Sequence, residues 1–306
     1  MIATHEYELL RQDAGLVERT GRAVIELEGA EAAEFLQGQV TNDVEALAPG
    51  SGCYAALLDH KGKVRTDLRV LRLEPDRLIV DAEPAGLPIL DHVFRTYSLG
   101  RQVSHTDLSG DHTVLSLIGP RSRAAIDPAP GESEHDHVLT AYGIAVTTDL
   151  GVDLVCGPSQ AAAARAELAV PEVSEEAAEC IRVESGRPRL GLDFDGTTIP
   201  QEASLNERAV SFTKGCYVGQ ETVARLHYKG KPNRHLRGLR LSALASHGDT
   251  IHFGDRQVGS VGSSCVSPIH GPIALALVRR EAELGDEVAV GDARAPATVV
   301  DLPFGA

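Results

Sequence analysis

Cys216 is the residue whose surroundings point most directly to chemistry. It lies in the segment Lys214-Gly215-Cys216-Tyr217-Val218-Gly219-Gln220-Glu221, between two glycines and beside a lysine. Glycine lets the backbone approach a partner closely, and a nearby cation such as Lys214 favours the thiolate, which is the reactive and metal-binding form of cysteine. A short Gly-Cys-x-x-Gly pattern alone is more often an ordinary turn. The complete octapeptide, however, predicts a reactive thiol loop.

Glu184 occupies the apolar stripe of an expected helix that begins near Ser174. Helical spacing places four residues on this stripe: Ala177, Cys180, Ile181 and Glu184. A carboxylate on an apolar stripe is costly unless it is paired. It could accept a bidentate hydrogen bond from an amidine-like edge of a ligand, or it could pair with Arg187 at the helix end. The spacing alone leaves both interpretations open.

Asp67 lies on an expected strand from Val64 to Val70, where apolar and charged residues alternate. Arg65, Asp67 and Arg69 share the polar face of this strand. The simpler interpretation is a solvated face on which two arginines flank the acid. The functional interpretation is a carboxylate placed to move a proton. Tyr54, on the preceding strand, is equally well explained as a half-buried sheet tyrosine.

The composition limits the classes of partner. A chain of 306 residues normally divides into two or three units, and 42% hydrophobic residues suffice for real cores. The net charge of −15 argues against direct binding of nucleic acid or of an anionic membrane. No run is long enough for a membrane span, and the segment Met1–Glu6 lacks the regions of a signal peptide. We therefore expect a cytoplasmic protein.

The cysteines and histidines do not follow a metal-site pattern. Five cysteines are scattered without a Cys-x-x-Cys pair, which predicts neither a disulfide framework, a zinc site nor a resident iron–sulfur cluster. All except Cys216 are expected to be small buried side chains. His135-Asp136-His137 ends the Pro-, Gly- and acid-rich stretch Asp127–His137, which predicts a solvated loop rather than a metal site.

The order of the expected elements favours an α+β fold. Helices are expected at 6–13 (ending at Gly15), 30–37, 88–97 and 159–169, and strands at 23–27, 54–58, 64–73, 77–80, 113–118, around 144 and at 152–155. Long parallel crossovers and a glycine-rich dinucleotide motif are missing from this pattern, which argues against a Rossmann sheet. Near residue 236 the helix signals fade, and short glycine-punctuated strands predict a small barrel. We therefore divide the chain into 1–235 and 236–306.

A basic segment interrupts this acidic chain directly after the Cys216 loop. Between Thr222 and Gly248 there is no acidic residue, but six basic ones occur: Arg225, Lys229, Lys231, Arg234, Arg237 and Arg240. Such a patch attracts an anionic ligand or an acidic partner, and a charged linker is the simpler alternative. Its position favours an anion-binding role.

These motifs together resemble the YgfZ family, folate-binding relatives of the glycine-cleavage T-protein (aminomethyltransferase). KGCYVGQE at 214–221 is similar to the family signature. The similarity covers nearly the whole chain through five further stretches: FLQGQVTNDV at 35–44, DHKGKV at 59–64, RVESG at 182–186, IPQE at 199–202 and LPF at 302–304. The resemblance implies a T-protein-like cloverleaf, in which two α+β units and a C-terminal β-barrel surround a folate cavity.

The resemblance also implies roles for single residues. Glu184 matches the glutamate that binds the pterin in T-protein, and Asp67 matches the aspartate beside folate N5 that assists one-carbon transfer. Tyr54 matches a folate-contacting tyrosine by its spacing ahead of Asp67. Asp81 stands where T-protein has a folate-contacting asparagine, although an acid cannot donate as an amide does. Arg225 and its basic neighbours would attract the carboxylates of a polyglutamylated tetrahydrofolate.

Two functions follow from the resemblance. In the first, an accessory protein uses bound tetrahydrofolate and Cys216 to support assembly or repair of iron–sulfur enzymes, including those that modify tRNA. Its partners would be iron–sulfur assembly proteins or client enzymes. T-protein lacks the KGCYVGQE element, so the thiol loop implies a task beyond one-carbon transfer. In the second, the protein is a tetrahydrofolate-dependent aminomethyl- or methyltransferase with Asp67 as acid or base. An RNA-binding module on the basic segment is a weaker alternative, because the net charge is negative.

Overall fold

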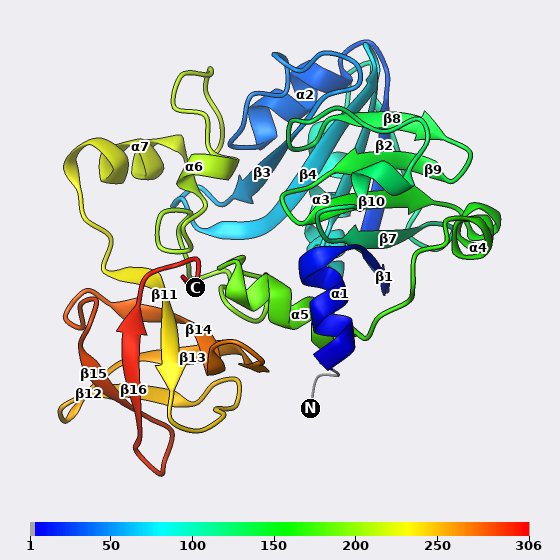
Figure 1. Ribbon diagram of the computed structural model, residues 1–306. Helices are drawn as coiled ribbons and strands as arrows, with labels where there is room; N and C mark the ends of the chain where they lie inside the picture. Colours follow the sequence, from blue (N-terminus) through cyan, green and yellow to red (C-terminus); the bar gives the residue numbers. More distant parts are fainter. Residues whose placement is uncertain (1–3, 306) are drawn as a thin grey trace.

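The computed structural model describes residues 4–305, which form two five-stranded sheets and a closed barrel (Figure 1). An α+β fold with a C-terminal β-barrel is thereby confirmed. The helices are α1 (Thr4–Gln12), α2 (Ala32–Gln39), α3 (Leu87–Tyr97), α4 (Pro158–Glu167), α5 (Glu175–Glu184), α6 (Asn206–Ala209) and α7 (Gln220–Lys229). In the described residues no helix is both long and apolar enough to cross a membrane. The first three residues of the segment Met1–Glu6 lie outside the described part.

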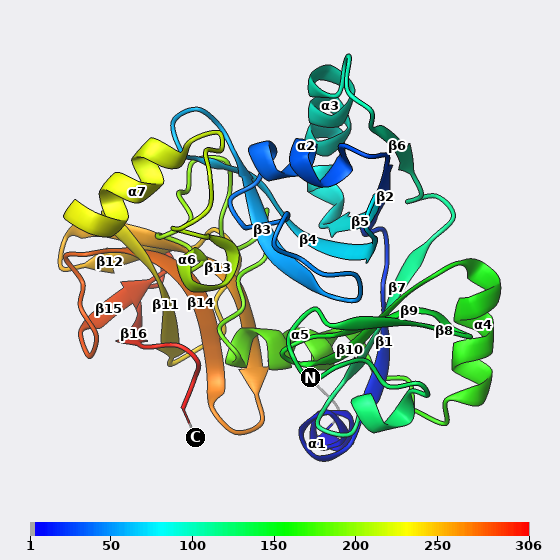
Figure 2. The same ribbon diagram turned by 90° about the horizontal axis from the view of Figure 1, so that it is seen from above.

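The first sheet has the strand order β3-β4-β5-β2-β6, and all neighbouring strands are antiparallel. Its strands are β3 (Gly52–Leu58), β4 (Val64–Glu74), β5 (Arg77–Ala82), β2 (Ala23–Glu28) and β6 (Ser104–Asp107). Helices α2 and α3 cover one face of this sheet (Figure 2). Phe35 and Phe94 of these helices are fully buried in the core on this face. The other face turns toward the second sheet, against which Val24, Leu71 and Ile79 pack.

The second sheet has the order β1-β7-β10-β9-β8. Its strands are β1 (Gly15–Arg19), β7 (Thr113–Ile118), β10 (Gly151–Cys156), β9 (Gly143–Thr147) and β8 (His137–Thr140). Helix α4 packs on its outer face, and Val114, Val146 and Val155 meet the first sheet on the inner face. Polar side chains next to this apolar contact therefore lie between two sheets.

The barrel closes in the order β11-β14-β13-β12-β15-β16. Its strands are β11 (Arg234–Leu241), β14 (Gly271–Arg279), β13 (Arg256–Ser267), β12 (Thr250–Phe253), β15 (Glu287–Val290) and β16 (Ala295–Val300). Helix α5 lies between the barrel and the two sheets (Figure 1) and packs against α1 and β13. The Ser174 hydroxyl caps α5 by accepting a hydrogen bond from the Ala177 amide, as its sequence predicts. The expected apolar stripe of α5 is buried.

Several elements were not expected from the sequence, among them β1, β6 and α7. Gly15 does not simply end the first helix but begins β1, which pairs with β7. The short edge strand β6 pairs with β2. Helix α7 follows the Cys216 loop directly, where glycines and charged residues obscure the helical period.

Candidate functional site

A cavity of about 480 Å³ lies between the two sheets and beside the segment that follows α5. Of the site residues predicted from the sequence, Tyr54 and Asp67 line it. In the part of the chain that the structure describes, the cavity lining does not include Cys216, Glu184, Asp81 or Arg225. The volume is typical of pockets that take a small molecule.

The β3–β4 hairpin positions Asp67 and Tyr54. Asp67 pairs with Ala56 and Tyr54 pairs with Arg69, so Tyr54 and Asp67 are diagonal neighbours on one face. The Tyr54 hydroxyl donates a 2.5 Å hydrogen bond to Asp67 Oδ2. Asp67 Oδ1 is buried and has no partner in the described residues. One oxygen of the carboxylate is therefore left for a ligand or a proton.

Burial sets the electrostatics of this pair. Desolvation raises the pKa of Asp67, the hydrogen bond from Tyr54 opposes that rise, and the charge of Glu83 adds to it. Burial and the neighbouring Asp67 hold the pKa of Tyr54 well above its usual range. Tyr54 therefore remains a donor, while Asp67 retains a proton to higher pH than an ordinary aspartate. A carboxyl group that can hold or accept a proton in this way is suited to acid–base work.

The polar face of β4 is not solvated, which corrects the simpler interpretation of that strand. Asp67 is 9% and Arg69 6% exposed. The reason is the second sheet, which covers this face and is invisible to the periodicity of a single strand. Arg65 alone of the three charged residues is exposed.

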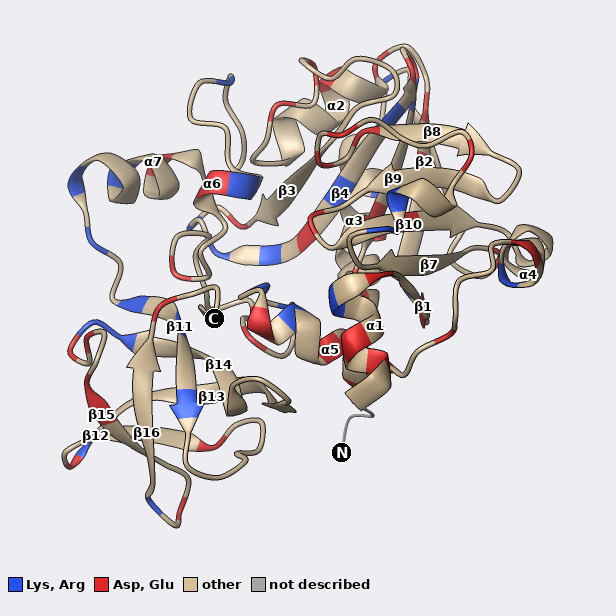
Figure 3. Ribbon diagram, in the orientation of Figure 1, with Lys and Arg blue, Asp and Glu red and all other residues tan. Residues whose placement is uncertain are grey.

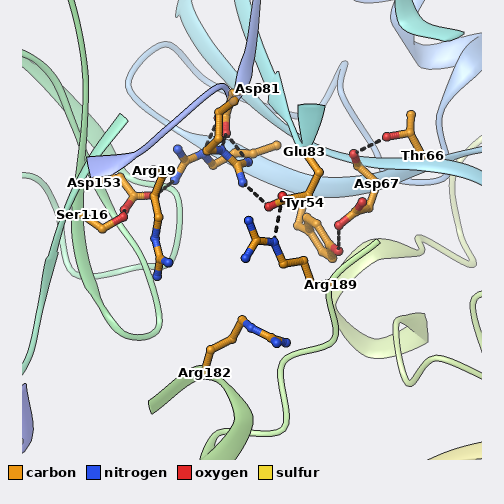
Figure 4. A network of polar contacts seen from close by, with 12 residues as sticks. Arg19, Tyr54, Thr66, Asp67, Asp81, Glu83, Ser116, Asp153, Arg182 and Arg189 are labelled. Carbon is orange, nitrogen blue, oxygen red and sulfur yellow. Dashed lines mark hydrogen bonds and ion pairs between the residues drawn. The ribbon is translucent and has the colours of Figure 1, made fainter. Parts of the chain in front are cut away.

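Asp81 lies behind the cavity wall and is fully buried. Its carboxylate accepts hydrogen bonds from Arg22 and from Arg69 at 2.5–3.0 Å (Figure 4). Although burial alone would raise it, the two guanidinium groups lower the pKa of Asp81. The role of Asp81 as a direct folate contact stays a prediction, and in this structure two arginines hold its carboxylate. Asp81 positions these two arginines, which do line the cavity.

These arginines join the two sheets through further acids. Arg69 donates to Asp153 of β10 at 2.7 Å, and Arg22 donates to Glu83 at 2.8 Å (Figure 4). Glu83 also accepts from Arg189, which follows α5. Arg69 Nη2 is buried and has no hydrogen-bond partner in the part of the chain that the structure describes. This network was not predicted from the sequence. The one sign of it in the sequence is the presence of charged residues at inward-facing strand positions.

The stretch Asp127–His137 was predicted to be a solvated loop, and this is wrong for its end. His135 and His137 are each 8% exposed, and His135 lines the cavity. Burial and the charges of Arg69 and Arg208 lower the pKa of His135 to about 3, so its ring stays neutral. Its Nδ1 is a further buried atom with no partner among residues 4–305. No group of three or more His, Cys, Asp and Glu side chains in those residues could hold a metal ion.

Glu184 joins α5 to α1 and to the barrel. It is 5% exposed, and both carboxylate oxygens accept from the Tyr7 hydroxyl, at 2.8 and 2.9 Å. The Ser267 hydroxyl donates to Oε1 at 2.5 Å, and Arg11 lies 3.8 Å away. The alternative pairing with Arg187 does not occur, since Arg187 pairs with Asp149. The role of Glu184 as a pterin anchor stays a prediction, and Glu184 is not among the described residues that line the cavity beside Asp67.

The thiol of Cys216 is exposed at the surface. The expected pairing of Lys214 with this thiol is not seen, because Lys214 makes its hydrogen bonds elsewhere. The Lys214 ammonium is buried and donates to the carbonyls of Gln37, Val40 and Asn42 at 2.6–2.8 Å, around the C-terminal end of α2. Burial lowers the pKa of Lys214 to about 8. Lys214 therefore anchors the Cys216 loop to the end of α2.

Two glycines fit the Cys216 loop onto the β3–β4 hairpin. Gly219 has φ +83°, and a side chain there would meet the Asp59 carbonyl at 2.5 Å. Gly62 has φ +79°, and a side chain there would meet Thr222 of α7 at 2.9 Å. These contacts explain Gly219 and Gly62, one glycine of each motif, by the close approach of the loop to the hairpin.

The loop and the cavity are linked through Asn42. Its side-chain amide donates to the Tyr54 carbonyl at 2.8 Å, and its own carbonyl accepts from Lys214. The exposed thiol and the buried Asp67 thus belong to one connected structure, although they face different surroundings.

The basic segment divides into two parts (Figure 3). Arg234 pairs with Glu202 and Arg237 pairs with Asp301. Arg225 and Lys229 on α7, with Lys231 after it, are exposed. This exposed part lies directly beyond the Cys216 loop in sequence and outside the cavity lining.

Two α+β units, a closed barrel and a polar cavity between the sheets define the class of protein. Residues 1–152 match the family model of the GCVT N-terminal domain, and residues 234–305 match that of the glycine cleavage T-protein C-terminal barrel domain. The chain belongs to this glycine cleavage T-protein family.

Similar proteins include aminomethyltransferases. An aminomethyltransferase of Synechococcus sp. (strain WH7803) is 28% identical over 98% of this chain and 89% of the relative. An uncharacterized protein of Haemophilus influenzae is 30% identical over 69% of this chain and 68% of its own length. The crystal structure of the glycine cleavage system aminomethyltransferase T from Bartonella henselae superimposes with a TM-score of 0.87, covering 98% of this chain and 89% of that one. At 23% sequence identity, that structure shows the fold.

Proposed function

We propose that this protein binds tetrahydrofolate in the cavity between the two sheets and uses the Cys216 loop to support assembly or repair of iron–sulfur enzymes. Asp67 carries the first part of this proposal. Its carboxylate is 9% exposed, and its Oδ1 has no partner in the described residues. An unpaired buried oxygen is costly, so it favours a ligand that supplies a donor.

The other buried atoms of the wall fit a heteroaromatic ligand. Arg69 Nη2 offers a donor, and His135 Nδ1 offers a donor or an acceptor according to its tautomer. Tyr54 and Asp67 would hold the ligand next to the Asp67 carboxyl group. When bound, tetrahydrofolate supplies a carrier for one-carbon groups. The residues of the chain would bind it, exclude water and hold or accept a proton at Asp67.

The position of Cys216 supports an accessory role. Its thiol is exposed and lies outside the cavity lining, where it can meet a macromolecule rather than the folate. The KGCYVGQE motif resembles the YgfZ signature, which T-protein lacks. The exposed Arg225, Lys229 and Lys231 nearby would attract an acidic partner or a polyglutamate tail. Iron–sulfur assembly proteins or client enzymes are the partners that we propose.

Paired variants test this division of labour. In cells lacking the native gene, Cys216→Ser should fail to restore iron–sulfur enzyme activity, including that of tRNA-modifying enzymes. The purified Cys216→Ser protein should still bind tetrahydrofolate with wild-type affinity. Asp67→Ala should lose folate affinity while its thiol remains reactive. Full restoration of the enzymes by Cys216→Ser would rule out the accessory role.

A tetrahydrofolate-dependent aminomethyl- or methyltransferase is the second candidate. The Tyr54–Asp67 pair favours it, because a carboxyl of raised pKa can transfer a proton at the reacting centre. The purified protein with tetrahydrofolate should then consume the glycine-cleavage intermediate, sarcosine or dimethylglycine. Asp67→Asn should abolish that turnover and Cys216→Ser should not. No consumption of any of the three would remove this candidate.

A further inference from the structure

Two cysteines from different parts of the fold lie against each other. Cys180 is on α5 and Cys265 is on strand β13 of the barrel, and their sulfur atoms are 3.5 Å apart. We propose that Cys180 and Cys265 are a redox-active pair that forms a disulfide joining α5 to the barrel. This inference does not depend on the proposed function.

The surroundings of the pair suit this reaction. Cys180 is fully buried, whereas Cys265 is partly exposed. A small oxidant can therefore reach Cys265 first. The sulfur atoms must approach by about 1.5 Å to reach a bond length of about 2 Å. Elsewhere in residues 4–305 no two thiols are in hydrogen-bond contact.

Hydrogen bonds connect the pair to a proton acceptor. Cys265 donates to the sulfur of Cys180, and Cys180 donates to Glu184 Oε1 at 3.6 Å. The hydrogen bond from Cys265 and burial raise the pKa of Cys180, so the free thiolate is disfavoured. Glu184 is placed to take the Cys180 proton at the moment when that sulfur becomes a nucleophile.

The reaction with hydrogen peroxide balances in two steps. The Cys265 sulfur attacks one peroxide oxygen and the O–O bond breaks. The departing hydroxide takes the Cys265 thiol proton and leaves as the first water, and Cys265 becomes a sulfenic acid. The Cys180 sulfur then attacks the sulfenic sulfur, and the S–S bond forms as the S–O bond breaks. The departing hydroxide takes the proton held by Glu184 and leaves as the second water. Two thiols are oxidised, and one peroxide is reduced to two waters.

The disulfide would constrain both the barrel and the cavity wall. It closes a loop between positions 85 residues apart in sequence, and closing so long a loop disfavours the unfolded chain. Helix α5 also carries Glu179 and Arg182, which line the cavity. Oxidation would therefore fix one wall of the cavity to the barrel.

Peptide mapping tests the proposal on the full-length protein. After treatment with hydrogen peroxide and blocking of free thiols, a Cys180–Cys265 cross-linked peptide should appear, about 2 Da below the sum of the two thiol peptides. The cross-link should raise the Tm, and dithiothreitol should remove both the cross-link and this increase. Cys265→Ser or Cys265→Ala should prevent the cross-link, and Cys156→Ser, which alters a buried thiol elsewhere, should retain it.

Oxidation of the exposed Cys216 shows in the same sample that the oxidant was sufficient. If Cys216 is oxidised while Cys180 and Cys265 are recovered as blocked thiols or as sulfinic acids, the pair does not form a disulfide and the proposal is wrong.

Discussion

The hydroxyl of Tyr54 donates a 2.5 Å hydrogen bond to one carboxylate oxygen of Asp67, and the other oxygen is buried without a partner in the described residues. The arrangement fixes one half of the carboxyl group and leaves the other half for a ligand. The hydrogen bond from Tyr54 therefore positions the carboxyl group on which the chemistry proposed for the cavity depends.

Tyr54→Phe should raise the pKa of Asp67 further. The mutation removes the hydrogen bond that lowers this pKa and leaves the desolvation that raises it. Carbon-13 NMR of labelled aspartate should show the Asp67 carboxyl titrating at higher pH than in the wild type. Tyr97→Phe is the matched control, because Tyr97 is exposed, and it should leave the titration unchanged. An unchanged or lower Asp67 pKa in Tyr54→Phe would contradict the account of this pair.

His135 should make the protein sensitive to acid. Its pKa is about 3 in the folded protein and 6.5 in a free side chain, so the unfolded state binds the proton first as the pH falls. The contribution of neutral His135 to the free energy of unfolding is therefore lost as the pH falls from 6.5 to about 3. Between pH 7 and 4.5 His135 should account for a loss of about 3 kcal/mol.

Urea unfolding at pH 7 and 4.5 measures this loss. His135→Asn should reduce it, because asparagine also tolerates the left-handed backbone at this position, where φ is 73°. His92→Asn changes an exposed histidine and should behave as the wild type. Equal losses in wild type and His135→Asn would show that the buried ring does not cause the acid sensitivity.

Glu184→Ala should lower the free energy of unfolding by about 1–3 kcal/mol, because the Tyr7 and Ser267 hydroxyls lose their buried acceptor. In a double-mutant cycle, Tyr7→Phe should remove part of that cost, since no Tyr7 donor then remains unpaired. Additive effects of the two mutations would show that the contact is not energetically coupled. Glu184→Ala also tests the predicted pterin anchor: weaker tetrahydrofolate binding by the variant, at a temperature where it is still folded, would support it.

Lys214→Met should also lower the free energy of unfolding, by about 1–3 kcal/mol, because three carbonyls around the end of α2 lose a charged donor. Lys231→Met removes an exposed lysine just beyond α7 and should change the stability little. Equal stabilities of the two variants would mean that Lys214 does not anchor the Cys216 loop.

Local patterns were sufficient to predict much of the fold. The hairpin around Gly62, the N-cap at Ser174 and the barrel each depend on short-range signals, and the structure contains all three. The boundary between 1–235 and 236–306 stays a prediction. Gly15 was misinterpreted because a glycine after a helix is compatible with both a turn and the immediate start of a strand.

The cavity could not be predicted in the same way, because it depends on contacts between distant segments. The polar face of β4 is covered by a second sheet, and Tyr7, the partner of Glu184, is 177 positions away. Lys214 is two residues from Cys216 but is held by carbonyls near α2. Residues near in sequence therefore predicted the wrong partner for Lys214 and predicted no partner for Asp81.

Calorimetric titration of tetrahydrofolate under reducing conditions tests the central claim most directly. Wild type and Cys216→Ser should bind equally, and Asp67→Ala should bind about tenfold or more weakly, since it loses the unpaired acceptor of the cavity. Thermal unfolding of each variant checks that it is folded. Absence of binding to the wild type, or wild-type affinity in folded Asp67→Ala, would contradict a folate site at Asp67.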